Sequence, residues 1–356
     1  MTATVISGSL RDYDWGAVDG LARWCGPTGG PEAELWFGAH PGAPSPLATA
    51  GGTLADVWPP GSVPLLAKLL AAGSPLSLQA HPDTATAAQW WSDPEARDLL
   101  ADTSEKTEML VAIDPFVVLA GWRAADPARA VLAAVGAAEP VLTALAAGDH
   151  ATAVRQLLGD HPVSADAEEW RAAWGRAGGS EVDLRATEAV VARFGRDPGV
   201  AVAALLAADL LQPGDAAYVP AGVPHAYVTG VGFEVMNSSD NVLRMGLTGK
   251  RMSVAHTLAA LRPDRTVEVI RRPADGDYAP VGAPFAVHAV RAGSWSEPGG
   301  RYRLVVNLAG ALSVAVDGTG YAVEPGQAVA ISADSSAADI IADDAVVVRA
   351  TQEATP

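Results

Sequence analysis

Short apolar runs separated by turn residues fill the first 120 residues of the chain. Among them are PLLAKLL, PLSLQA and EMLVAI, which begin at Pro64, Pro75 and Glu108. Runs of this length bounded by Gly and Pro are typical of strands. The pattern changes between about residues 124 and 211, where Ala- and Leu-rich segments with helical spacing predict a helical insert.

After the insert, the segment from Leu211 to Asn237 returns to short alternating runs with Pro-Gly and Gly turns, which predicts strands again. The segment RMSVAHTLAAL predicts one more helix. From about Val267 onward, apolar stretches joined by Gly-containing turns predict a second β-sandwich or barrel. We therefore expect a mainly β fold in three parts: a β unit of residues 1–123 and 212–264, a helical insert of residues 124–211, and a smaller β unit of residues 265–356.

Composition and charge narrow the class of protein. A formal net charge of −17 argues against nucleic acid or an anionic membrane as partner, since both require a basic surface. The start MTATVISGSL lacks a basic segment followed by a long apolar one, and no run approaches eighteen uninterrupted apolar residues, so we expect a cytoplasmic protein. The single cysteine, Cys25, excludes an internal disulfide and a Cys-type zinc site. Any metal must then be held by nitrogen and oxygen.

Lysine is rare in this chain. Of the 24 basic residues only Lys68, Lys106 and Lys250 are lysines. Arginine has replaced lysine at positions where a solvated positive charge is sufficient. The remaining lysines are therefore expected where a compact ammonium group matters, as in a phosphate or proton-transfer site. The alternative is that the three are accidental survivors.

Two pairs of polar residues lie at strand ends. Gln79 and His81 are two positions apart, as are Lys106 and Glu108, so each pair shares one strand face. A carboxylate leading into the apolar run after Glu108 is costly to bury unless it is paired or metal-bound. Taken singly, each pair also fits a solvated strand end with a hydrogen-bonded surface histidine.

A more specific signal is GDAAYVPAGVPHAYVT, from Gly214 to Thr229. Its spacing of Gly, Pro, Gly and His resembles the second motif of the cupin superfamily, although Thr229 replaces the usual Asn. The resemblance implies that His225 faces into a barrel as a metal ligand. Four residues, Gln79, His81, Glu108 and His225, then supply a mixed nitrogen and oxygen set suited to zinc, with room for water or substrate.

At this point the chain resembles the type I mannose-6-phosphate isomerase family. The matching segments, in family order, are YDWG, AELWFGAHP, LLAKLL, LSLQAHPD, EKTEML, VPAGVPHAY and SSDNVLRMGLTGK, which cover most of residues 5–253. The resemblance implies a cupin-type jelly-roll enzyme with one Zn²⁺ per chain, held by Gln79, His81, Glu108 and His225. It also implies a phosphorylated hexose as substrate, and interconversion of mannose 6-phosphate and fructose 6-phosphate through a cis-enediol or enediolate.

By the same pattern, Lys106 and Arg244 are expected to be catalytic. The candidate substrate-binding residues are Ser77, Lys68, Lys250, Tyr227, Asp240, Glu234 and Trp15. The general base stays open, since His81, Glu234, Asp240 and a zinc-bound hydroxide are alternatives to Lys106, and His40 is a further residue at the mouth. The family usually has proline where this chain has Thr107 and Gly249, which concerns loop rigidity more than chemistry.

Two other functions remain open from the residues alone. One is a non-catalytic sugar-phosphate-binding or regulatory cupin, and the other is a metal-dependent cupin oxygenase, although the latter would more naturally use a histidine-rich iron site. The ligand set, the three lysines and Arg244 favour the isomerase. We expect no nucleic-acid or membrane partner, and a monomer or weak homo-oligomer.

Overall fold

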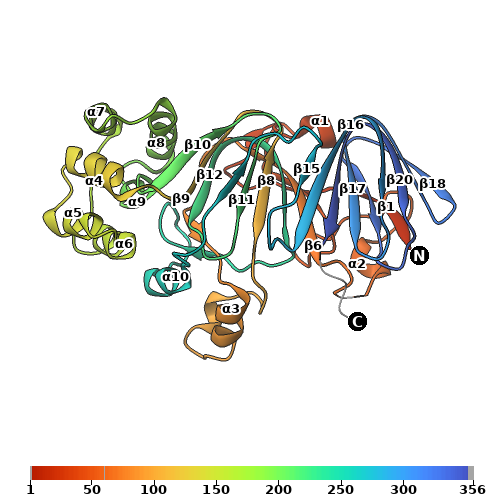
Figure 1. Ribbon diagram of the computed structural model, residues 1–356, viewed down its shortest axis with the longest axis horizontal. Coiled ribbons are helices and arrows are strands. Elements are labelled where there is room, and N and C mark those ends of the chain that lie inside the picture. Colours follow the sequence, from red (N-terminus) through yellow and green to blue (C-terminus); the bar gives the residue numbers. More distant parts are fainter. Residues whose placement is uncertain (1, 60, 352–356) are drawn as a thin grey trace.

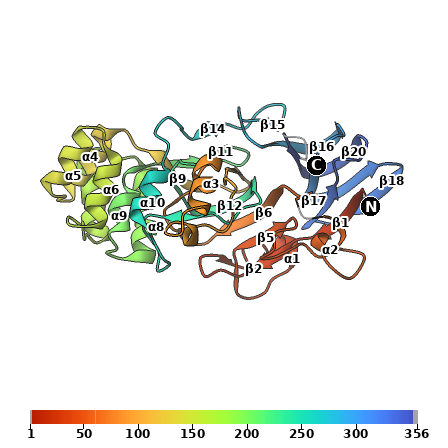
Figure 2. The same ribbon diagram turned by 90° about the horizontal axis from the view of Figure 1, so that it is seen from below.

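The computed structural model describes residues 2–59 and 61–351, which form three regions in a row (Figures 1 and 2). Helices of the insert lie at one end, a large sheet lies in the middle, and the C-terminal sheet lies at the other end. This order confirms the mainly β fold with a helical insert that the sequence predicts. No helix within the described residues is long and apolar enough to cross a membrane.

The middle sheet contains eleven of the described strands, and its main path runs β14, β11, β8, β12, β6, β5 and β2. The remaining four attach beside it, with β9 joining β12 to β10, and β7 joining β12 to β13. The bounds are β2 Ser9–Arg11, β5 Glu34–Phe37, β6 Leu65–Ala72, β7 Gln79–Ala80, β8 Glu108–Ala112, β9 Phe116–Trp122, β10 Leu206–Leu211, β11 Ala216–Val219, β12 His225–Asn237, β13 Leu243–Arg244 and β14 Glu268–Ile270.

The C-terminal sheet runs in the order β1, β19, β17, β20, β16 and β15, with β18 paired to β17. The bounds are β1 Ala3–Ser7, β15 Asp277–Tyr278, β16 Phe285–Glu297, β17 Arg303–Val316, β18 Thr319–Val323, β19 Gln327–Ile331 and β20 Ala338–Ala350. A separate two-stranded ribbon pairs β3, Ala17–Val18, with β4, Pro31–Glu32.

The expected boundaries between the units differ from the structure in three places. Strand β1 pairs with β19 in the C-terminal sheet, although it belongs to the segment expected in the first β unit. Strand β10 closes the segment predicted as helical insert and pairs with β9, while β14 pairs with β11 although it lies beyond residue 264. Strand partners are set by tertiary contacts, which a boundary drawn along the sequence does not capture.

Helices form the insert, and three of them begin with a side-chain N-cap hydrogen bond. These are α4 Ala125–Ala134, α5 Glu139–Ala146, α6 His150–Leu158, α7 Ala167–Ala177, α8 Glu181–Phe194 and α9 Gly199–Ala203. At the start of α7 the Asp166 side chain accepts hydrogen bonds from the Glu168 and Glu169 amides, and Gly178 ends the helix with φ of 71°. The other helices are α1 Ala22–Cys25, α2 Leu54–Val57, α3 Thr84–Trp91 and α10 Val254–Ala260, with a 3₁₀ turn at Arg97–Leu99.

One hydrophobic core joins the two sheets. Leu65, Leu69 and Phe233 of the middle sheet belong to the same buried cluster as Phe285 and Val348 of the C-terminal sheet. Successive side chains of a strand point to opposite faces of the sheet. In β6, β8 and β12, every other side chain therefore points into this core, and the side chains between them point to the other face of the sheet. The alternation places three charged residues on the face directed away from this core: Lys68, Glu108 and Glu234.

Candidate metal centre and active-site cavity

Three strand beginnings converge at the outer face of the middle sheet. Glu108 begins β8, His225 begins β12 directly after the Pro-x-Gly turn, and Gln79 begins β7 with His81 just beyond it. Gln79 is the antiparallel register partner of His225, which brings residues far apart in sequence side by side. Ala80 between the two predicted ligands is fully buried in the insert-side core, as its position on the opposite face predicts.

The imidazole nitrogens face one carboxylate oxygen. The Nε2 atoms of His81 and His225 lie 3.4 Å and 3.0 Å from Oε2 of Glu108, and all three side chains are buried. One ligand atom from each residue lies within 4.8 Å of the others, so the three could hold a metal ion. The amide nitrogen of Gln79 is 3.3 Å from Nε2 of His225, and a half-turn of that amide would place its oxygen there instead.

Backbone carbonyls fix the tautomer of both histidines. The Nδ1 atom of His81 lies 2.6 Å from the Asn241 carbonyl oxygen, and Nδ1 of His225 lies 3.1 Å from the Val223 carbonyl oxygen. A carbonyl only accepts, so each Nδ1 carries the proton and donates it, and each Nε2 keeps its lone pair. Burial, with the nearby Lys106 ammonium, lowers the pKa of His81 to about 4, so this imidazole is neutral at physiological pH.

The fit of a cation to this cluster rests on Glu108. Its Oε1 accepts a hydrogen bond from the Lys106 ammonium, whereas its Oε2 is buried and has no hydrogen-bond partner among the described residues. Burial would raise the pKa of Glu108, but Lys106 and the two histidines lower it well below its usual range. A buried, unprotonated oxygen opposite two imidazole lone pairs is costly unless a cation binds there. The donor set is that of a zinc site.

The cluster opens into a cavity with a volume of about 760 Å³. Every predicted site residue lines this cavity except His81, His225 and His40, which are buried. These lining residues are Trp15, Lys68, Ser77, Gln79, Lys106, Glu108, Tyr227, Glu234, Asp240, Arg244 and Lys250. The sequence therefore predicted eleven of the residues that line this one cavity, from segments that are distant along the chain.

Lys68 is bound between two buried carboxylates. Its Nζ lies 2.9 Å from Oε2 of Glu234 and 3.2 Å from Oε1 of Glu34, while the Trp36 indole donates a 2.8 Å hydrogen bond to the other Glu34 oxygen. Burial alone would lower the pKa of Lys68, but Glu234 and Glu34 raise it well above its ordinary value. The charge of Lys68 is therefore already compensated within the protein.

The uncompensated cations of the cavity are elsewhere. Arg244 is half-buried and Lys250 is exposed, and neither forms an ion pair with a described residue. Arg193 of helix α8 also lines the cavity, where it donates a hydrogen bond to the Ser74 hydroxyl and lies 3.1 Å from the exposed carboxylate of Asp14. Burial lowers the pKa of Arg244 from a very high ordinary value, so the guanidinium stays charged.

Two further predicted residues are positioned by their neighbours. The half-exposed Asp240 carboxylate lies 3.2 Å from Nε2 of buried His40, whose Nδ1 accepts from the Gly42 amide. His40 therefore donates to Asp240, and this hydrogen bond lowers the pKa of the carboxyl. Tyr227 is buried and its hydroxyl has no hydrogen-bond partner among the described residues, which leaves it available to a ligand.

Sequence reasoning missed Glu34, Arg193 and Asn241. Glu34 was visible in the family-like segment AELWFGAHP, two positions before Trp36 and so on its strand face, but was not singled out. The Asn241 side chain accepts from Ala101 and donates to the Ser104 carbonyl, which holds the loop before Lys106. Arg193 lies in the helical insert, where no local pattern distinguishes it from other surface arginines.

Comparisons with known proteins agree with this geometry. Residues 4–125 match the family model for the catalytic domain of type I phosphomannose isomerase. Mannose-6-phosphate isomerase of Escherichia coli K12 is 29% identical over 286 residues, which covers 71% of this chain and 73% of that protein. The human enzyme of the same name is 28% identical over 269 residues, or 63% of this chain and 62% of that protein.

Solved structures show the same fold. Mannose 6-phosphate isomerase of Salmonella typhimurium, solved with fructose 6-phosphate and zinc, superposes with a TM-score of 0.82 at 23% identity, and covers 99% of this chain and all of that one. A zinc-bound mannose 6-phosphate isomerase gives a TM-score of 0.80 at 24% identity over the same shares. Together these matches show that the chain has the fold of the mannose 6-phosphate isomerases over nearly its whole length, and that residues 4–125 are similar to the catalytic domain of type I phosphomannose isomerase.

Proposed function

We propose that the chain is a zinc-dependent aldose–ketose isomerase that interconverts mannose 6-phosphate and fructose 6-phosphate. The observation that carries this proposal is the convergence of His81, Glu108 and His225 on one point beside a cavity with uncompensated cations. The names of the relatives, and the zinc and fructose 6-phosphate in the Salmonella structure, support the choice of metal and substrate.

Four residues would hold the metal: Gln79, His81, Glu108 and His225. When bound, zinc supplies a Lewis acid that stabilises negative charge on the sugar oxygens. The protein prepares this centre by fixing both imidazole tautomers through the Asn241 and Val223 carbonyls.

The reaction requires a balanced pair of proton movements. One proton leaves C2 of the open-chain aldose and returns to C1, while another passes from the C2 hydroxyl to the C1 oxygen. We assign the proton that passes between the two sugar oxygens to Lys106, whose buried ammonium lies 3.4 Å from Nε2 of His81 and can donate to the C1 oxygen while it regains a proton from the C2 hydroxyl. The proton that leaves C2 needs an unprotonated acceptor in the cavity, for which Glu234 and Asp240 are the candidates. Arg244 lies opposite Gln79 in the strand register, so its unpaired charge is placed to stabilise the enediolate.

We assign binding of the substrate phosphate to the cations in the outer part of the cavity. Lys250 carries no ion pair with a described residue, and the partner of Arg193, Asp14, is 87% exposed and so holds it weakly. Lys68 is instead assigned to holding Glu234 and Glu34 in place. We expect Lys250→Met to raise KM for the phosphorylated sugar several-fold with a smaller effect on kcat, because phosphate binding contributes alike to the ground and transition states.

A spectrophotometric assay coupled to fructose 6-phosphate formation tests the proposal. The protein stripped by a chelator should be inactive and should regain turnover when one equivalent of zinc is restored. A zinc-loaded protein that binds mannose 6-phosphate without turning it over would instead identify the non-catalytic sugar-phosphate-binding cupin. The cytoplasmic location and the monomeric or weakly oligomeric state remain predictions, which cell fractionation and light scattering would check.

A further inference from the structure

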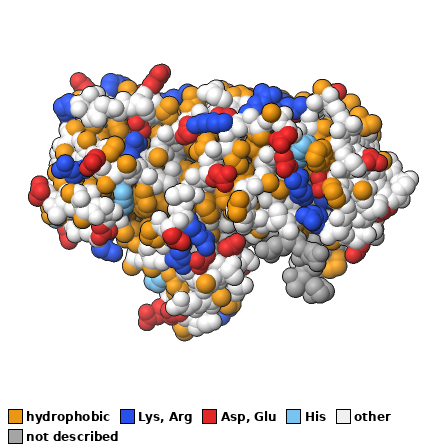
Figure 3. Space-filling view, viewed as in Figure 1, with side chains coloured by type: hydrophobic (Ala, Val, Ile, Leu, Met, Phe, Trp, Pro, Cys, Tyr) orange, Lys and Arg blue, Asp and Glu red, His pale blue; other side chains and the backbone are white. Residues whose placement is uncertain are grey.

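A second cavity lies outside the proposed active site, where the middle region meets the C-terminal sheet. Its volume is about 480 Å³, and its walls are the segment before β15 and the middle of β16. Figure 3 shows Lys and Arg side chains gathered near the upper edge of this face, with a histidine below them. None of the residues that line it lines the active-site cavity.

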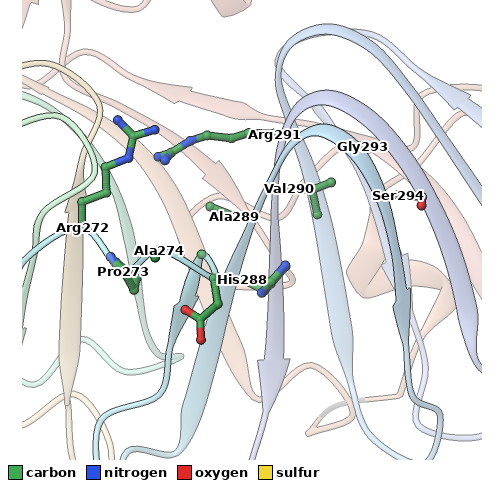
Figure 4. Close-up of a pocket in the computed structure, with 11 residues that line it drawn as sticks. Arg272, Pro273, Ala274, His288, Ala289, Val290, Arg291, Gly293 and Ser294 are labelled. Carbon is green, nitrogen blue, oxygen red and sulfur yellow. The ribbon is translucent and has the colours of Figure 1, made fainter.

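Two arginines dominate this cavity. Figure 4 shows the guanidinium groups of Arg272 and Arg291 pointing toward one another. Neither forms an ion pair with a described residue. Both side chains lie over Gly214, because a Cβ there would come within 2.8 Å of Cδ of Arg272 and 3.3 Å of Nη2 of Arg291.

The segment that carries Arg272 is fixed in place. The Arg272 amide donates a 2.9 Å hydrogen bond to the Asp215 carboxylate, and Gly276 accepts one of 2.9 Å from the Ala289 amide. A Cβ at Gly276 would come within 2.6 Å of the Ala289 carbonyl oxygen, so the segment packs directly on β16. Backbone contacts thus fix the segment that carries Arg272, and the pairing of β16 with β20 fixes the backbone of Arg291.

The wall of the cavity adds a buried polar atom. His288 is 6% exposed, its ring stacks on Trp295 at a centroid distance of 3.6 Å, and its Nδ1 has no hydrogen-bond partner among the described residues. The nearest carboxylate oxygen, Oδ1 of Asp277, is 3.6 Å away and accepts a 2.8 Å hydrogen bond from Arg349. This carboxylate is therefore already engaged.

Two acidic residues lie near the pair, and neither forms an ion pair with it. Asp275 lines the cavity, and its carboxylate accepts from the Asp277 amide. Asp344 is the register partner of Arg291 across β16 and β20; burial raises the pKa of this carboxyl, and the charges of Arg291 and Arg272 partly oppose that rise. The lining therefore carries two guanidinium charges against one carboxylate, on a chain whose net charge is −17.

We propose that Arg272 and Arg291 form a binding site for a phosphate-type oxyanion, either free phosphate or the phosphate of a small ester. Two planar guanidinium groups that face each other repel, and a tetrahedral dianion between them converts that repulsion into charge-assisted hydrogen bonds. The remaining cavity, with His288 on its wall, leaves room for an organic group. Because the site spans Gly214 and the C-terminal sheet, an occupant links the two units.

Inorganic phosphate tests this site on the zinc-loaded full-length protein. Isothermal titration calorimetry should show a binding event, weakened by added salt, whose Kd rises at least about tenfold in the double variant Arg272→Gln, Arg291→Gln. Arg129→Gln is the matched control, since Arg129 is an exposed arginine of the helical insert with no ion pair to a described residue. A second phosphate-binding event at the active-site cavity would be unchanged in both variants.

A thermal readout distinguishes binding from folding. Phosphate should raise the melting temperature of the wild type and the control more than that of the double variant, because a ligand stabilises the state that binds it. The single variants, each of an exposed side chain, should fold and show intermediate shifts. Equal phosphate affinity and equal melting shifts in all proteins would overturn the proposal, while turnover in the coupled assay reports on the proposed function separately. Free phosphate and a phosphate ester are then compared by titrating both.

Discussion

Replacing Lys68 with Met should destabilise the protein strongly. The substitution removes a buried ammonium whose Nζ lies 2.9 Å and 3.2 Å from the carboxylates of Glu234 and Glu34, and leaves both acids without a cation. Breaking a buried ion pair from one side costs about 3 to 5 kcal/mol, because the remaining charge is desolvated and unpaired. We expect a loss of that size in the free energy of unfolding at pH 7, measured by urea titration.

The defect should also depend on pH. Burial already raises the pKa of Glu234 while Lys68 opposes that rise, so with Lys68 absent this carboxyl takes up a proton still more readily in the folded state than in the unfolded one. The folded protein then binds more protons, and its stability falls as pH rises through this window. The difference between Lys68→Met and the wild type should therefore be smaller at pH 5 than at pH 8.

Lys250→Met is the matched control. It removes the same charge from an exposed position without an ion pair to a described residue, and should change the free energy of unfolding by no more than about 0.5 kcal/mol. A Lys68→Met protein that lost less than about 1 kcal/mol would refute the reasoning. Such a result would mean that Lys68 is not the counter-ion of the buried acids, and would return it to the list of phosphate contacts.

Three further measurements test other parts of the structure. Glu108→Gln should lower zinc content to well below one per chain and abolish turnover, with elemental analysis as the direct readout. Burial would raise the pKa of Asp183, but hydrogen bonds from Arg123 and Ser180 outweigh it and lower the pKa. The ionised Asp183 carboxylate therefore stabilises the folded protein. This stabilisation is complete above the pKa that Asp183 has in the unfolded chain, and it is lost as pH falls through the lower pKa of the folded protein. Asp183→Asn should cost about 1 to 3 kcal/mol at pH 7 and little near pH 3 in urea titrations. Burial, with Glu32 and Asp19 nearby, raises the pKa of Cys25 to about 11, so iodoacetamide should alkylate the folded protein far more slowly at pH 8 than the protein in urea; equal rates would contradict this.

The strand-face rule and the cupin-like spacing predicted from the sequence the residues that the fold brings together as the candidate metal cluster. Gln79 with His81, and Lys106 with Glu108, each reach one face because they lie two positions apart in an extended chain. The Pro-x-Gly turn then predicted His225, which the strand register places opposite Gln79. These signals are local, and local geometry transmits them reliably to the fold.

Partners across strands and between units could not be predicted in the same way. The capture of Lys68 by Glu34 and Glu234 depends on which strands flank β6, a choice made by tertiary packing. Arg193 reaches the cavity because helix α8 packs against β9, β10 and β12, and nothing in its own sequence neighbourhood records that contact. The sequence thus predicted which polar residues gather at the cavity, and the fold decides which of their charges are already compensated by a neighbour.

The pairing of β1 with β19 has a consequence for how the chain is made. Ala3 leaves the ribosome long before its partner, Ile331, has been synthesised. Until then the backbone N–H and C=O groups of β1 lack strand partners. Pairing of strands so distant in sequence is slow, because the chain loses the entropy of a long loop before the contact forms. A nascent or C-terminally truncated chain therefore carries an open strand close to the proposed catalytic unit. Removing the C-terminal segment that contains β19 should therefore cause aggregation that begins at the N-terminal strand β1.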